Sequence, residues 1–171
     1  MVGIINYIGN IGSVKNALDY LKIPNFIADK PEQLCDATHI IIPGVGNWTE
    51  GVKRLKPFYK YLKSTRKPIL GICLGHQLLA RESKEGEGRG LGLLNCKVRK
   101  LKNQRVGWYP VKDKTYYFVH GYSIFFNGHQ IDEFEIDNLT GCQYHLEKSQ
   151  SDGLERLKNW YEKNNPSAII A

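Results

Sequence analysis

The stretch formed by residues 67–80 constrains the fold of this chain more than any other part of its sequence. It begins with a short apolar run, residues 69–72, which has the length of a buried parallel strand, and it continues past Cys73 into a helical pattern of apolar residues. Gly71 and Gly75 flank Cys73 at two positions on either side, as in the cysteine version of the nucleophile elbow. We predict a strained backbone at Cys73 and no room for a side chain at either glycine.

Such an elbow predicts a reactive thiol. It would place the sulfur at the carboxyl end of a strand and at the amino end of a helix, where the helix dipole and the free N–H groups favour the thiolate. Cys73 is therefore the candidate nucleophile. The other cysteines are expected to be small core residues, and no pair has C-x-x-C spacing, so we expect no zinc site; they are Cys35, Cys96 and Cys142.

The first half of the chain alternates between apolar strand segments and amphipathic helical segments. The predicted strands are residues 2–6, 25–28, 38–42 and 68–72. The predicted helices are residues 14–22, a segment from Pro31, and residues 48–64, which Pro57 should interrupt. This alternation predicts an α/β fold with a doubly wound, mostly parallel sheet and helices on both faces.

After residue 80 the pattern changes to a β-rich second half. We predict a glycine-rich loop over residues 82–92, a final helix over residues 151–163, and short β segments over residues 96–101, 116–120, 122–126, 134–136 and 141–144. No internal repeat or linker is visible, so one domain is expected to span residues 1–171. The apolar end, residues 168–171, is either a docked tail or disordered.

Composition excludes several classes of function. No run of about 18 apolar residues is present, so no membrane span is expected. The first residues lack the features of a signal peptide, and a cytoplasmic location is therefore expected. The net charge is +7, but the basic residues are scattered and accompany no nucleic-acid-binding motif. We favour solvated helix faces as their explanation, over a basic docking surface or a route for an anionic substrate.

A thiol nucleophile needs a base, and the base needs a group that orients it. His145 is the best candidate among five histidines, because it closes an apolar segment and precedes Glu147 by two positions. At the carboxyl end of a parallel strand, His145 would share an edge of the sheet with Cys73. Glu147 could then bond the ring nitrogen that faces away from the sulfur and fix the tautomer.

A tetrahedral intermediate also needs N–H donors for its oxyanion. The elbow offers the backbone N–H of Leu74. Gly44, Val45 and Gly46 follow the carboxyl end of another predicted strand, so their amides are candidates for a second donor. An ordinary strand-to-helix turn explains these glycines equally well on the residues alone.

Together these segments resemble the class I (triad) glutamine amidotransferases. The resemblance rests on the elbow, the glycine loop and the His-x-Glu-Lys-Ser segment, at residues 71–77, 43–46 and 141–149. Further segments are similar to one branch of that family, the glutaminase subunit of imidazole glycerol phosphate synthase; they are residues 4–7, 9–11, 13–14, 90–93, 106–108 and 117–122. The resemblance covers nearly the whole chain.

The resemblance implies a glutaminase with no cofactor and no metal. Cys73 would attack the side-chain amide of L-glutamine, His145 would move the protons, and Glu147 would orient His145. Gln77 and Glu85 match positions that hold the backbone groups of glutamine in the family. Residues 121–122, which are Gly121 and Tyr122, would line the same pocket.

The family also implies a partner. Ammonia would pass to a separate synthase chain, a (β/α)8 barrel in this branch, without entering the solvent. The glycine loop after Pro43 would switch on the oxyanion hole, and Trp108 would lie near the interface. Neither a membrane nor a nucleic acid is expected as a partner.

Several positions depart from the family pattern. The usual His-Pro-Glu is here His145-Leu146-Glu147, Asn6 replaces a usual Asp, and the segments 108–116 and 122–141 are short. We therefore expect the glutaminase chemistry to be intact, and we expect the short segments in the β-rich half to alter the partner surface. Three alternatives remain: a glutaminase that serves another synthase, such as a sugar amidotransferase of surface polysaccharide biosynthesis; a non-catalytic regulatory protein on the same fold; and a stand-alone cysteine hydrolase or peptidase.

Overall fold

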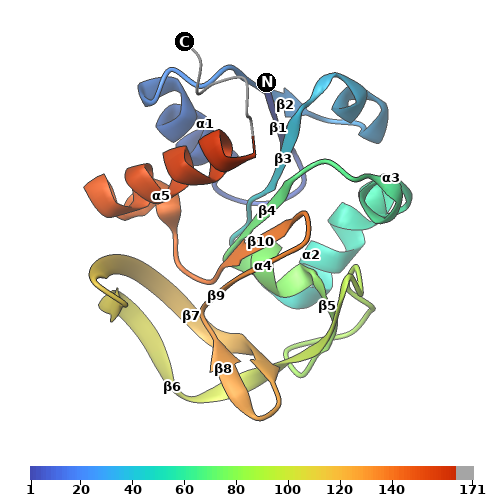
Figure 1. The fold of residues 1–171 in the computed structure, drawn as a ribbon. Coiled ribbons are helices and arrows are strands. Elements are labelled where there is room, and N and C mark those ends of the chain that lie inside the picture. Colours follow the sequence, from blue (N-terminus) through green and yellow to red (C-terminus); the bar gives the residue numbers. More distant parts are fainter. Residues whose placement is uncertain (165–171) are drawn as a thin grey trace.

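A six-stranded sheet forms the centre of the molecule in the computed structural model, which describes residues 1–164 (Figure 1). The strand order is β2-β1-β3-β4-β10-β9, and every neighbouring pair is parallel except β9 and β10. The strands are β1 (Val2–Ile5), β2 (Asn25–Ala28), β3 (His39–Ile42), β4 (Ile69–Ile72), β9 (Glu133–Ile136) and β10 (Leu139–Cys142). This arrangement confirms the predicted α/β class.

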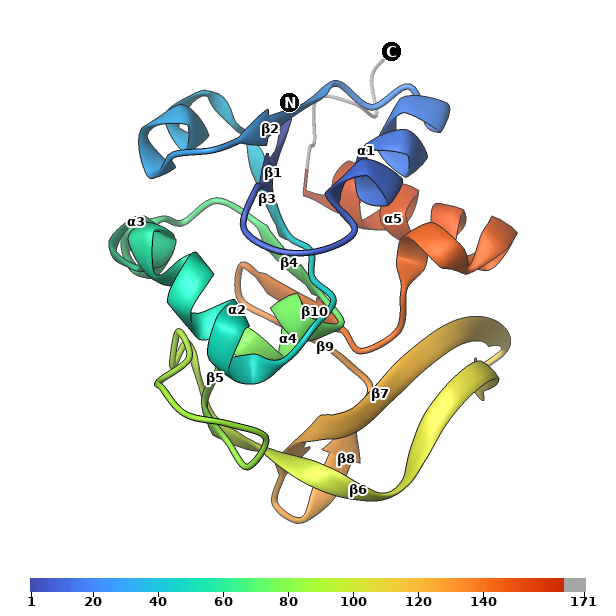
Figure 2. The same cartoon turned by 180° about the vertical axis from the view of Figure 1, so that it is seen from behind.

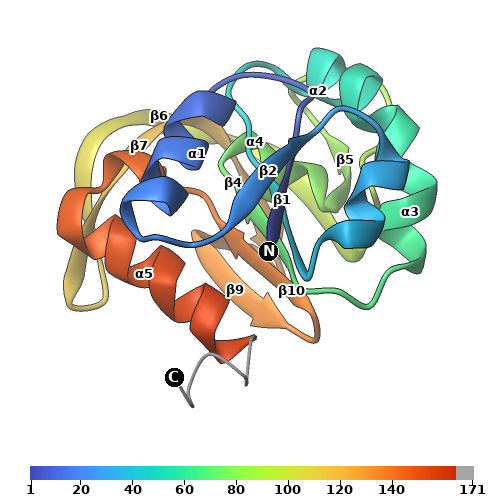
Figure 3. The same cartoon turned by 90° about the horizontal axis from the view of Figure 1, so that it is seen from above.

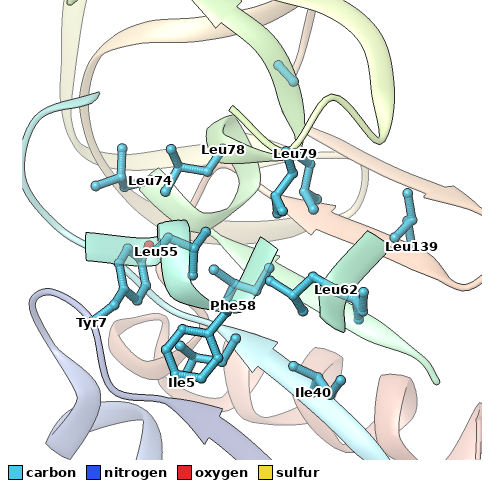
Figure 4. Close-up of a cluster of buried hydrophobic side chains, with 14 of the residues drawn as sticks. Ile5, Tyr7, Ile40, Leu55, Phe58, Leu62, Leu74, Leu78, Leu79 and Leu139 are labelled. Carbon is cyan, nitrogen blue, oxygen red and sulfur yellow. The ribbon is translucent and has the colours of Figure 1, made fainter. Parts of the chain in front are cut away.

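Helices cover both faces of this sheet (Figure 3). One face carries α1 (Ile11–Tyr20) and α5 (Gln150–Lys163); the other carries α2 (Trp48–Leu55), α3 (Tyr59–Ser64) and α4 (Leu74–Leu78). The central strand β3 supplies both layers, because Ile40 and Ile42 face the second group of helices while Ile41 faces the first. Figure 4 shows the side of Ile40, where side chains of α2, α3 and α4 meet those of the strands.

Helix boundaries follow the sequence pattern with a few differences. Pro57 does interrupt the helix predicted over residues 48–64, because a 3-10 turn (Lys56–Phe58) separates α2 from α3. The segment from Pro31 forms a 3-10 helix (Pro31–Asp36) rather than an α-helix. The first helix begins three residues earlier than predicted, at Ile11. Within residues 1–164, no helix combines the length and apolar character that crossing a membrane requires.

The β-rich second half forms a separate four-stranded sheet of order β5-β6-β7-β8. Its strands are β5 (Ala80–Ser83), β6 (Leu94–Val111), β7 (Lys114–Phe126) and β8 (His129–Ile131). β6 and β7 form a long curved ribbon that reaches from this sheet toward α5 (Figure 2). At its tip, the backbone N–H of Thr115 donates to the carboxylate of Asp152 over 2.9 Å.

The predicted boundaries in this half were partly wrong. The helix after the elbow ends at Leu78, and β5 follows at Ala80–Ser83, so the first two residues of the loop predicted over residues 82–92 pair with β6. The two strands predicted over residues 116–126 are one strand, β7, and β6 runs ten residues beyond the predicted end. The pairing of β6 with β7 determines how long both strands are. Neither sequence shows a regular apolar periodicity from which this length could be predicted. The tail at residues 168–171 lies outside the described residues.

Candidate active site

The elbow predicted around Cys73 is present between β4 and α4. Cys73 has φ +51° and ψ −106°, a conformation that a residue with a side chain rarely adopts. A Cβ atom on Gly75 would lie 1.8 Å from the carbonyl oxygen of Ile42, and one on Gly71 would lie 2.7 Å from the carbonyl oxygen of Gly75. The strain at Cys73 and the need for both glycines are therefore confirmed.

The structure brings His145 and Glu147 to the elbow. The imidazole Nδ1 lies 2.7 Å from Oε1 of Glu147, and both side chains are buried. The sulfur of Cys73 interacts electrostatically with the imidazole, and the thiol donates to the carbonyl of Val119 over 4.0 Å. The backbone N–H of His145 donates to the carbonyl of Tyr117 over 2.9 Å, which anchors this segment to β7. β10 ends at Cys142, so His145 follows the strand at a distance of three residues instead of closing it as predicted.

The surroundings of His145 favour its protonated form. Burial alone would lower its pKa, but the hydrogen bonds to Cys73 and Glu147 and the negative charges of these groups outweigh burial and raise the pKa to about 10. A protonated imidazole between the sulfur of Cys73 and the side chain of Glu147 is thus the favoured state of His145. A positive charge beside the sulfur is one of the features that activate a cysteine nucleophile.

A pocket of about 440 Å³ opens above Cys73. Its lining contains most of the predicted site residues, namely Val45, Gly46, Cys73, Leu74, Gln77, Glu85, Gly121, Tyr122 and His145. Glu147 lies behind His145, and Gly44 lies outside the lining. The pairing of β6 with β7 is interrupted between Lys100 and Arg105, so Gly121 has no paired residue opposite it. A ligand in the pocket can therefore reach the backbone of this segment.

The glycine loop after β3 engages the N–H that the sequence predicts as an oxyanion donor. The N–H of Leu74 donates to the carbonyl of Gly44 over 3.3 Å. Gly44 and Gly46 have φ of +156° and +126°, in the region that favours glycine. The hydroxyl of Tyr7 donates to the carbonyl of Pro43, and a Cβ on Gly44 would lie 2.4 Å from that hydroxyl. In this conformation Leu74 has no free N–H for an oxyanion.

Two polar side chains of the pocket are held by hydrogen bonds. The amide nitrogen of Gln77 donates to the carbonyl of Tyr122 over 2.7 Å and to Oε1 of Gln143 over 3.1 Å. The carboxylate of Glu85 accepts from the backbone N–H of Trp48 over 3.1 Å. Partial burial raises the pKa of Glu85, although the bond from Trp48 opposes this effect. An incoming ammonium group would relieve this desolvation by pairing with the carboxylate.

Sequence reasoning missed several residues around the pocket. Gln143 donates to Sγ of Cys73 over 3.8 Å, and Asn10 donates to Glu147. Four other missed residues line the pocket; they are Gln104, Val119, His120 and Lys148. Gln143 could have been found, because it is a polar residue inside an otherwise apolar segment beside His145. Residues 1–164 contain no group of three or more His, Cys, Asp or Glu side chains that could hold a metal ion.

Comparison with known proteins places this pocket in context. The family model described as glutamine amidotransferase class-I matches residues 4–130. The imidazole glycerol phosphate synthase subunit HisH 2 of Methanococcus maripaludis is 32% identical over 201 aligned positions, which cover 95% of this chain and all of that protein. The subunit HisH of Exiguobacterium sibiricum is 36% identical over 185 positions and 95% of each chain. Both alignments are longer than this chain of 171 residues, so both relatives contain insertions.

Solved structures share the fold. One glutamine amidotransferase superposes with a TM-score of 0.75 at 20% identity, over 95% of this chain and 98% of that one. A glutamine amidotransferase from Thermotoga maritima gives a TM-score of 0.61 at 18% identity, over 99% and 85% of the two chains. At this level of identity, the likeness concerns the fold alone.

Proposed function

The chain belongs to the class-I glutamine amidotransferase family, and on this premise we propose that it is the glutaminase subunit of an imidazole glycerol phosphate synthase. It hydrolyses L-glutamine to glutamate and ammonia and passes the ammonia to a cyclase subunit of histidine biosynthesis. The observation that carries this proposal is that Cys73 and His145 line one pocket while Glu147 holds His145 from behind. The glutaminase domain spans residues 1–171, and it works in the cytoplasm without a cofactor.

The triad performs the reaction in two halves. The sulfur of Cys73 attacks the side-chain amide carbon of glutamine, and the imidazolium of His145 gives a proton to the leaving nitrogen, so that ammonia departs and a thioester remains. His145 then takes a proton from a water molecule that attacks the thioester, which releases glutamate and restores the thiol. Glu147 holds the proton on Nδ1 of His145 throughout, so that the other ring nitrogen faces the sulfur.

The pocket walls bind the backbone groups of glutamine. Glu85 pairs with the ammonium group of the substrate, which compensates the desolvation of its carboxylate. Gln77 supports the wall through its bond to the carbonyl of Tyr122. Gly121, which has no paired residue on β6, offers backbone groups to the substrate, and Tyr122 lines the pocket beside it. The substrate is thus held at both ends of its amino-acid moiety while its side chain points to Cys73.

Activity depends on the glycine loop. The oxyanion hole of the proposal consists of the Leu74 N–H and an amide from the loop Gly44, Val45 and Gly46. In the structure the carbonyl of Gly44 accepts from the Leu74 N–H, so the loop must rearrange before an oxyanion can bind. We expect slow glutamine hydrolysis by the free chain and strong activation when the synthase and its ligand order the loop.

The partner in this proposal is a cyclase-type (β/α)8 barrel that forms a heterodimer with this chain. Trp108 on β6 is 46% exposed and supplies an apolar contact for it. One observation favours a second candidate, a glutaminase that serves a different synthase such as a sugar amidotransferase. The alignments with two relatives are longer than this chain, so the chain lacks segments that those relatives have.

The test measures glutamine-dependent ammonia release with each candidate synthase and its ligand. Cys73→Ala abolishes the release, whereas Cys35→Ala, which changes an exposed cysteine outside the pocket, leaves it intact. Persistent ammonia release by the Cys73 variant would refute the triad. Activation by a polysaccharide-type synthase and not by the cyclase barrel would replace the first partner with the second.

A further inference from the structure

Asn10 joins the beginning of the chain to the proposed triad. It lies in the loop between β1 and α1, and its side-chain nitrogen Nδ2 donates a hydrogen bond to Oε1 of Glu147, a residue 137 positions away. That same oxygen accepts from Nδ1 of His145. The bond is possible because the start of α1 packs against the short 3-10 helix Leu146–Lys148, which carries Glu147.

The position of Asn10 suggests a different role, which the structure does not support. Asn10 is the N-cap residue of α1, where an Asn side chain normally accepts a hydrogen bond from a backbone N–H of the first turn. Its side chain makes no such bond, and its Oδ1 is buried without a partner among residues 1–164. The side chain gives up the favourable cap and directs its donor to Glu147, which points to a role at the site.

The carboxylate of Glu147 depends on this donor. Its side chain is almost fully buried, and within residues 1–164 its hydrogen-bond donors are His145 Nδ1 and Asn10 Nδ2, while Oε2 has no partner. A buried carboxylate that lacks donors tends to take up a proton or to turn toward solvent. Without Asn10, the imidazole of His145 would be the only donor to this carboxylate among the described residues 1–164.

We propose that Asn10 is a positioning residue of the glutaminase reaction, which fixes the orientation of Glu147 and acts on His145 through it. The inference rests on the proposed function and deepens it. Asn10 touches neither the pocket nor the reacting atoms. Its amide keeps Oε1 of Glu147 aimed at Nδ1 of His145, which keeps the other ring nitrogen aimed at Cys73.

Two charged or titratable neighbours besides Glu147 act on His145: Cys73 from the elbow and His120 from β7. Lys148 lines the pocket at its side. These groups are unchanged when Asn10 is replaced, so a shift in the titration of His145 reports the loss of the Asn10 amide. A weaker interaction between the Glu147 carboxylate and Nδ1 of His145 would make the imidazolium less stable. The imidazolium would then stabilise negative charge on the sulfur of Cys73 less well.

The test compares Asn10→Ala and Asn10→Asp with the wild-type chain. Asp has the shape of Asn but offers no donor at neutral pH and places a second carboxylate against Glu147. Asn6→Ala is the matched control, because Asn6 lies in the same loop and bonds the exposed Asp29 over 2.6 Å. The first readout is the pH profile of Cys73 alkylation by iodoacetamide, followed by mass spectrometry of the Cys73 peptide. The second is kcat and KM for glutamine in the activated complex.

We expect Asn10→Ala to lower the alkylation rate at neutral pH and kcat by about 10- to 100-fold, the usual range for a lost hydrogen bond to a charged group, with KM changed by less than about twofold. Asn10→Asp is expected to be the more impaired variant, and the alkylation rate of both variants should approach that of the wild type as the pH rises and the thiol ionises. A merely structural Asn10 would give the reverse order, since Asp fills its space, and that order would overturn the inference. Variants with the kcat and pH profile of Asn6→Ala would overturn it as well.

Alkylation needs neither glutamine nor a partner, so this readout tests the role of Asn10 even if the wild-type chain releases no ammonia. A wild-type chain that releases no ammonia would refute the proposed function alone.

Discussion

Replacement of Gly75 by alanine tests the argument that the elbow depends on two bare backbone positions. The new Cβ would lie 1.8 Å from the carbonyl oxygen of Ile42, whereas real Cβ atoms essentially never come closer than 3.0 Å to a neighbour. The carbonyl oxygen belongs to the backbone of β3, and the new Cβ is bonded directly to the backbone of α4. Neither atom can turn away, so β3 and α4 must separate by more than an ångström. Overpacking of a core costs about 1–3 kcal/mol, and a clash with rigid backbone belongs at the upper end, at about 3 kcal/mol.

Thermal unfolding measures this cost. For a chain of this size about 1 kcal/mol corresponds to about 2–4 °C, so Gly75→Ala should lower Tm by about 6–12 °C. Gly12→Ala is the matched control, because Gly12 is exposed in α1 and a Cβ there meets nothing within 4 Å. We expect this control to gain about 0.5–1 kcal/mol from the reduced entropy of the unfolded chain. A Gly75 variant that melts within about 2 °C of the wild type would show that the contact with β3 does not constrain the elbow.

Three further changes test the site and its surface. Glu147→Gln should lower the pKa of His145, which is raised to about 10 in the wild type. The raised pKa stabilises the folded wild type fully below about pH 6.5, and this stabilisation is lost as the pH rises through about 10. The difference in unfolding free energy between the wild type and the variant, measured by urea denaturation, should therefore narrow from about pH 6.5 to about pH 10, and a constant difference would refute the argument. Glu85→Gln should raise KM for glutamine by about 10-fold or more with little change in kcat, and an unchanged KM would remove Glu85 from the substrate site. Trp108→Ala should leave Tm nearly unchanged and weaken binding of the synthase barrel by about 10- to 100-fold, so equal affinity by calorimetry would place the interface elsewhere.

The parts of the molecule that sequence predicted well are those with strong local rules. The strand, the cysteine and the helix of the elbow lie within a few residues of one another, and Gly71 is required by a contact inside that unit. The strands of the parallel sheet are short apolar runs, which burial on both faces demands. In each case, the residues that form the element are close together in the sequence.

The parts that sequence missed depend on contacts between distant segments. β5 pairs with β6, and β6 pairs with β7. The sequences of these strands do not alternate regularly between apolar and polar residues, so they give no clear strand signal. The hydrogen bond between Asn10 and Glu147 joins residues 137 positions apart. The hydrogen bond from Leu74 to Gly44 forms in only one of the conformations open to the glycine loop. No local propensity encodes such choices, because the packing of whole elements decides them.

The glycine loop separates two properties of the site that the motif alone treats as one. In the free chain the triad is assembled, but the Leu74 N–H is bonded to Gly44, so a nucleophile is present without its oxyanion donor. Alkylation of a thiolate passes through no oxyanion, whereas attack on an amide does, and loss of one such donor costs about 10²–10³ in kcat. The free chain should therefore react with iodoacetamide at Cys73 at a rate that partner binding changes little, while glutamine hydrolysis rises by about 10²–10³ on binding. Equal stimulation of both reactions would mean that the partner assembles the triad itself.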